Sequence, residues 1–125
     1  MDMEEQDIPD KLLVTAYGDG GFRVLGKRYE GSILVTPDEV LAWPVDAQVD
    51  FANLDITPFR ALAGKVDILL IGTGEQHKAL PSAVRQQLQD AGISVDFMAT
   101  GPACRTFNVL QAEGRPVAVA LIAVD

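Results

Sequence analysis

Two short loops in this chain carry the residue types that bind small polar ligands. Gly72-Thr73-Gly74 follows the apolar run 66–71, and Thr100-Gly101-Pro102 follows the segment 93–98. Glycines let backbone amides approach an anion. Both loops are expected to leave parallel strands at their carboxyl ends, where open α/β sheets bind ligands. The sequence thus predicts a crevice whose candidate ligand-binding residues are Gly72, Thr73, Gly74, Thr100, Arg105 and Asn108.

A small anion would suit the amides of these loops, with Arg105 or Lys78 supplying positive charge. The net charge of −8 opposes an anion, so the predicted affinity is weak and salt-sensitive. The structural alternative is that the glycines only form tight turns and that Thr100 is a helix N-cap. In that alternative Asn108 orients a loop carbonyl instead of a ligand.

Signatures of nucleotide, metal and hydrolase sites are missing from the sequence. The dinucleotide fingerprint needs a third glycine where His77 stands, and the glycine-lysine-serine/threonine ending of a P-loop is absent. No H-E-x-x-H, G-x-S-x-G or C-x-x-C pattern occurs either. We therefore assign no catalytic residue, no metal ligand and no cofactor.

Cys104 is the single cysteine, and it is expected in the first turn of a helix, where the helix dipole lowers a thiol pKa. His77 is the single histidine, so one Cys–His pair is arithmetically available. A free cysteine also serves as a small buried hydrophobe. We predict this structural role for Cys104.

Composition limits the classes of partner. Ten basic residues face eighteen acidic ones, and a chain of this charge is a poor match for nucleic acid or an anionic membrane surface. The apolar runs are too short to span a bilayer, which takes about 20 residues. The first residues are acidic, unlike a signal or transit peptide, so we expect a cytoplasmic protein.

The sequence predicts an α/β fold in one domain, residues 11–125, after an acidic tail at residues 1–10. Strand-like segments at 12–17, 22–25 and 32–35, with a turn at Gly26, predict an antiparallel meander. A further short strand covers 40–43, and its Trp43 is expected to be a core or edge anchor. Thr57 is the expected N-cap of a short helix that Gly64 closes.

The second half of the chain predicts a parallel β-α-β unit. The continuous apolar run 66–71 is typical of a strand buried on both faces, and 93–98 is the next strand. Helix 81–91 joins them, so we expect the two strands to be parallel neighbours. A second helix at 101–113 and a central strand at 117–124 complete a mixed sheet covered by two helices.

The chain also resembles the Mth938-like family, from Leu12 onward. The residues that carry this resemblance include the Gly72-Thr73-Gly74 loop, the run from Arg105 to Asn108, and flanking positions such as Thr57-Pro58, Trp43 and Gly114-Arg115. The resemblance implies a three-layer fold with a central mixed sheet, and an uncharacterised bacterial member as the better match. A eukaryotic branch of the family resembles mitochondrial complex I assembly factor 3, which implies action through protein partners.

The sequence therefore favours a non-enzymatic protein-interaction or assembly-factor-like domain with unidentified protein partners. No nucleic acid and no membrane insertion are expected, and homo-oligomer formation is left open. The alternative is a protein or enzyme that binds a small anion or polar ligand in the crevice between loops 72–74 and 100–105.

Overall fold

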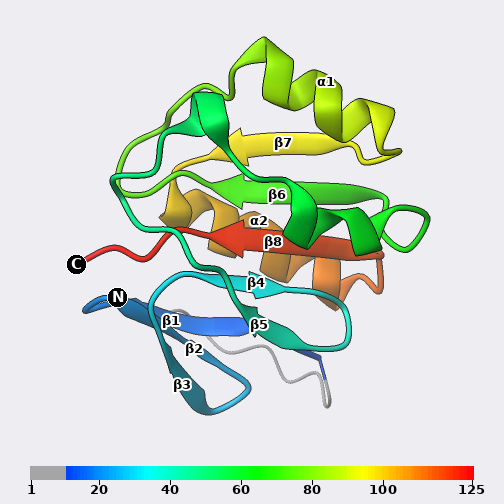
Figure 1. Ribbon diagram of the computed structural model, residues 1–125. Coiled ribbons are helices and arrows are strands. Elements are labelled where there is room, and N and C mark those ends of the chain that lie inside the picture. Colours follow the sequence, from blue (N-terminus) through cyan, green and yellow to red (C-terminus); the bar gives the residue numbers. More distant parts are fainter. Residues whose placement is uncertain (1–10) are drawn as a thin grey trace.

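The computed structural model describes residues 11–125; the predicted tail, residues 1–10, lies outside the described residues. This part of the chain forms a three-stranded sheet, a five-stranded sheet, two α-helices and two short 3-10 helices (Figure 1). The five-stranded sheet is the middle layer. Helix α2 (Thr100–Ala112) lies behind it in this view, and helix α1 (Ser82–Asp90) lies beside β7 (Val95–Met98).

The centre of the five-stranded sheet is the last strand, β8 (Val117–Leu121). β8 pairs in parallel with β6 (Ile68–Gly72) and antiparallel with β4 (Ile33–Val35). The edges are β7, parallel to β6, and β5 (Val40–Ala42), antiparallel to β4. The predicted mixed sheet is confirmed, and so is the β6–α1–β7 unit with its parallel strands.

The three-stranded sheet is the antiparallel meander of β1 (Val14–Gly18), β2 (Gly21–Val24) and β3 (Lys27–Glu30). The expectation that segment 32–35 continues this meander is wrong, because β4 joins the larger sheet. All three residues of β4 are buried, whereas β3 is partly exposed throughout. Three consecutive apolar side chains need cover on both faces of a strand, and the middle layer provides it.

Each face of the middle sheet carries its own hydrophobic core, because successive side chains of a strand point to opposite faces. In β6, Leu69 and Ile71 pack with helix α1 and the 3-10 helices η1 (Phe51–Asn53) and η2 (Thr57–Leu62). Leu70 packs into the second core, with α2 and the three-stranded sheet. Each fully buried side chain of this size stabilises the fold by about 1.5–3 kcal/mol.

The segment between β5 and β6 covers the first core. Trp43 is buried, as predicted, and its ring meets Phe59 edge-on at 5.6 Å between centroids. The predicted N-cap at Thr57 is wrong. Thr57 is the first residue of η2, and the Asp55 carboxylate accepts its backbone N–H at 2.9 Å. Ile56 holds the N-cap position without a side-chain bond, and the aspartate satisfies the first helical amide through a turn with the residue two ahead.

The β2–β3 hairpin turns on two residues, Leu25 and Gly26, between the paired residues Val24 and Lys27. Their φ angles are 48° and 79°, so both lie in the left-handed region. Glycine adopts this region freely, but a bulky side chain is strained in it. The Leu25 side chain is 56% exposed, so burial gives the strain little compensation.

We predict that Leu25→Asn raises the free energy of unfolding by about 0.5–1 kcal/mol, because asparagine is favoured at the first position of this turn type. Urea unfolding measures the change. Val109→Asn is the matched control, since Val109 is 58% exposed but lies in helix α2 and has no turn strain to relieve. A Leu25→Asn protein that is no more stable than the parent would contradict the strain.

Candidate functional site

The loops after β6 and β7 meet, as the sequence predicts. The Gly74 N–H donates to the Thr100 hydroxyl at 3.0 Å, and the Thr100 N–H donates to the Gly74 carbonyl at 2.8 Å. The carboxyl ends of β6, β7 and β8 lie at one edge of the sheet, and the chain's C-terminus is at the same edge (Figure 1). The structure therefore brings together Gly72, Thr73, Gly74 and Thr100.

Thr100 joins three segments through one hydroxyl. Besides accepting from Gly74, it donates to the Ile122 carbonyl at 2.7 Å, directly after β8. The side chain is completely buried. The N-cap interpretation of Thr100 is wrong: Ala99 occupies that position, and no side chain caps α2. A buried hydroxyl is stable only when hydrogen-bonded, and here both of its partners are backbone groups of neighbouring segments.

Thr73 is used in a similar way. Its hydroxyl donates to the Gln76 carbonyl at 2.7 Å and accepts the Lys78 N–H at 3.1 Å, while its own N–H donates to the Met98 carbonyl at 2.8 Å. These bonds shape the turn that follows β6. The amides of Thr73, Gly74, Lys78 and Thr100 are all engaged within the chain.

Gly72 has a steric role. A Cβ atom there would come within 2.9 Å of Leu121 Cδ2 and 3.0 Å of the Thr100 Cα. The absence of a side chain therefore lets the first turn of α2 cross the end of β6. Sequence reasoning treated this glycine as a turn or ligand residue and did not identify the close approach of a helix.

Asn108 and Arg105 lie outside this contact. The Asn108 side chain accepts the Val14 N–H at 2.9 Å and donates to the Val14 carbonyl at 2.8 Å, so it binds the backbone of β1 as a neighbouring strand would. The structural alternative expected Asn108 to orient a loop carbonyl; the carbonyl it binds is instead that of Val14, in strand β1. Arg105 is exposed on α2, and its Nη2 would lie 3.6 Å from a Cβ atom at Gly101, close to the start of the helix.

Tyr17 on β1 is a neighbour of the loops that sequence reasoning missed. A Cβ atom at Gly101 would come within 2.6 Å of the Tyr17 hydroxyl, so glycine makes room for the ring over the start of α2. The sequence does contain a signal for this contact, because Gly101 lies in the first turn of a predicted helix. A glycine there leaves room for a side chain from another element to come close to the helix.

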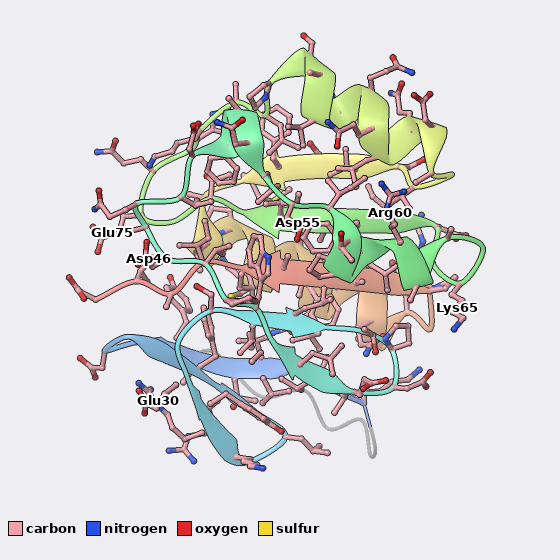
Figure 2. The ribbon with its side chains drawn as sticks, in the orientation of Figure 1. Glu30, Asp46, Asp55, Arg60, Lys65 and Glu75 are labelled. Atoms are coloured by element: carbon pink, nitrogen blue, oxygen red, sulfur yellow. The ribbon has the colours of Figure 1, made fainter. Side chains whose placement is uncertain are left out.

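Two open clefts flank the loops. One, of about 360 Å³, is lined by residues 73–76, Lys78 and the C-terminal residues 123–125. The other, of about 270 Å³, lies between Gly74, Tyr17 and Gly101. Glu75 and Asp125 line both clefts. Figure 2 shows Glu75 and Asp46 at this same end of the molecule. Among the residues that line the two clefts, Lys78 is the one basic residue against the carboxylates of Glu75 and Asp125, a balance that opposes an anion; the anion site stays a prediction.

Cys104 lies in the second core, between α2 and the sheet, and is completely buried. Burial raises the pKa of its thiol to about 12, and the Arg105 charge offsets this only in part. The His77 ring stacks on Phe97, whose side chain packs against the first core. The two side chains therefore belong to opposite faces of the sheet and do not form a Cys–His pair.

Two further observations apply to residues 11–125. Residues 11–125 include no cluster of three or more histidine, cysteine or acidic side chains that could hold a metal ion. No helix in this range is both long and apolar enough to cross a membrane.

Comparison with known proteins gives consistent matches. The family described as "Protein of unknown function (DUF498/DUF598)" matches residues 14–122. "NADH dehydrogenase [ubiquinone] 1 alpha subcomplex assembly factor 3" of Rattus norvegicus is 32% identical over 118 residues. That alignment covers 94% of this chain and 64% of the rat protein, so this chain spans about two-thirds or less of such relatives.

Solved structures match over nearly their full length. A crystal structure described as an outer membrane protein from Bartonella henselae is 38% identical, with a TM-score of 0.82, and the match covers 94% of this chain and 98% of that one. A solution structure of a Bordetella pertussis protein, described as a Mth938-like domain, is 29% identical with a TM-score of 0.75. That match covers 98% of this chain and 92% of the other.

We predict that Thr100→Val lowers the free energy of unfolding by about 2–4 kcal/mol, because the Gly74 N–H and the Ile122 carbonyl would both lose a buried partner. Thr100→Ser keeps the hydroxyl and should lose only about 1 kcal/mol for its methyl group. Urea unfolding of the two variants separates these effects. A valine variant as stable as the serine variant would show that the hydroxyl bonds contribute little.

The Cys104 thiol should make stability depend on alkaline pH. Its pKa is 9.0 when unperturbed and about 12 in the fold, so the neutral thiol is favoured by folding. This stabilisation is complete below pH 9 and is lost as pH rises towards 12. We predict that Cys104→Ala is about 1 kcal/mol less stable at pH 7 and that the difference closes by about pH 10. Denaturant unfolding at both pH values measures it; a difference unchanged by pH would contradict the raised pKa.

Proposed function

The chain belongs to the DUF498/DUF598 family of Mth938-like proteins, and from that premise we propose that it is a non-enzymatic, assembly-factor-like domain that binds another protein. The name of its eukaryotic relatives directs the proposal to an NADH dehydrogenase as the complex whose assembly it assists. The partner would be a subunit of that complex or another assembly protein.

The observation that carries the proposal is that the polar groups of the predicted crevice bond to the chain itself. The Thr73 and Thr100 hydroxyls and the Gly74 amide hold loops together, and the Asn108 amide holds β1. Cys104, the one thiol, is buried with a raised pKa, so it is a poor nucleophile. These groups serve the fold, and a surface that binds protein needs no reactive side chain.

A small polar ligand is the second candidate, because the two clefts beside Gly74 offer space and Lys78 lines the larger one. Amide chemical shifts recorded during titration with phosphate, sulfate and small carboxylates distinguish the candidates. Localised shifts at residues 72–78 and 100–105 would favour ligand binding. Saturating anion without localised shifts would favour the protein-binding proposal.

The proposal predicts that deleting the gene for this chain, in the organism that carries it, lowers the amount of assembled NADH dehydrogenase on native gels. The wild-type chain should restore the complex, and so should Cys104→Ala, because no thiol chemistry is involved. Subunit transcript levels serve as the control for expression. Unchanged assembled complex after deletion, or failure of a folded Cys104→Ala chain to restore it, would refute the proposal.

A further inference from the structure

The edge strand β5 presents backbone groups that are not paired within the sheet. β4 and β5 are antiparallel, with Leu34 opposite Leu41. Just outside this register, the Trp43 N–H donates to the Ser32 carbonyl at 3.0 Å, and the Thr36 N–H donates to the Glu39 carbonyl at 2.9 Å. Along antiparallel strands, hydrogen-bonded residue pairs alternate with pairs that are not hydrogen-bonded. Residues 39, 41 and 43 of this segment belong to the bonded pairs, so residues 40 and 42 belong to the pairs that are not bonded to β4.

Val40 and Ala42 therefore turn their N–H and C=O groups away from β4. Beyond β5 there is no further strand in the described part of the chain. Nor does any other segment of residues 11–125 donate to or accept from these four groups. The other edge of the same sheet differs, because the Asp96 carboxylate accepts the Phe97 N–H of β7 at 2.9 Å.

Two hollows flank β5 along its length. A groove of about 370 Å³ lies at its beginning and has a largely apolar lining that includes Leu34, Pro37, Leu41, Pro58, Leu62 and Pro116. A more open hollow of about 530 Å³ lies at its end, beside Ala42, Trp43 and Val45. Leu41 is 41% exposed and belongs to the groove wall. An extended chain along β5 would thus run from one hollow to the other.

Acidic side chains stand at both ends of this path. Asp38 and Glu39 line the groove, and Asp46 lines the hollow. Lys65 is the one basic residue lining the groove. Figure 2 shows it at the end of the molecule opposite Asp46. The whole chain carries a net charge of −8. Charge complementarity therefore favours a segment with lysine or arginine.

We propose that β5 and its two flanking hollows, here called the β5 edge surface, bind an extended apolar segment of a partner protein that carries lysine or arginine. The segment adds a strand to the sheet by bonding to the backbone of Val40 and Ala42. One apolar side chain enters the groove beside Leu41, and its basic residues face Asp38, Glu39 or Asp46. Main-chain bonds give such complexes affinity, and side-chain pockets give them specificity.

A second copy of this chain is a less suitable occupant. Two chains of net charge −8 repel each other, and a copy would bring the same acidic residues to the surface. The inference rests on the proposed function, since it states how a protein partner is held.

The test uses a phage library of random nine-residue peptides selected on the immobilised full chain. Enriched peptides should alternate apolar residues with others and contain lysine or arginine. Ala42→Pro removes an outward N–H that takes no part in the β4 ladder, so it should weaken the best peptide at least about tenfold. Leu41→Ser should do the same through the groove, because it removes an exposed apolar contact without adding a charge that would attract the peptide's lysine or arginine.

Val109→Ser is the control, since it places the same hydroxyl at an exposed apolar position on α2 and should change affinity less than about twofold. Unfolding curves check that each variant folds. Selection without such peptides, or equal binding to Ala42→Pro, Leu41→Ser and the parent, would overturn the inference. So would sedimentation showing a dimer of the parent that Ala42→Pro dissociates, because a second copy would then be the occupant.

The same variants separate this inference from the proposed function. In cells lacking the gene, a folded Ala42→Pro chain should fail to restore the NADH dehydrogenase that the parent restores. Full restoration by Ala42→Pro would leave the assembly role standing and overturn the β5 edge surface. An unchanged complex in the deletion strain would refute the assembly role, while the peptide selection would still decide on the surface.

Discussion

The arrangement of this fold depends on the hydroxyl of Thr100. It accepts from Gly74 and donates to Ile122, so one buried group ties the loop after β6, the start of α2 and the end of β8. The helix reaches that position because Gly72 has no side chain to block it. With α2 held there, the second face of the sheet is covered, and the apolar strands β6 and β8 are buried on both sides. The two hydrophobic cores lie on opposite faces of this sheet.

Much of this architecture could be predicted from the sequence, because its strongest signals are local. The continuous apolar runs identify β6 and β8, and the spacing of Val84 and Leu88 identifies the buried side of α1. The place of β4 could not be predicted, since three apolar residues after a hairpin do not say which sheet they join. The partners of Thr100 and Asn108 lie 22 to 94 residues away in sequence, so no local pattern could reveal them.

The same contacts change how the candidate residues are interpreted. Glycine and threonine at the carboxyl ends of parallel strands are typical of ligand sites, and the proximity of the two loops was predicted correctly. In the fold, their amides and hydroxyls join the loops to each other. The outward-facing backbone groups of Val40 and Ala42 lie instead at β5, on the opposite side of β8 from β6 and β7, beside an apolar groove with acidic residues. The proposed protein-binding role uses the region around β5, and the two loops hold the fold together.

Amide hydrogen exchange of the free chain tests this division most directly, because one experiment reports on both regions. The Gly74 amide should be among the strongly protected ones, as expected for a buried donor held by Thr100. The amides of Val40 and Ala42 should exchange close to their intrinsic rates, while Leu41, between them, is protected by β4. Fast exchange at Gly74 together with protection at Val40 and Ala42 would contradict the account, since the open backbone would then be at the loops and not at β5.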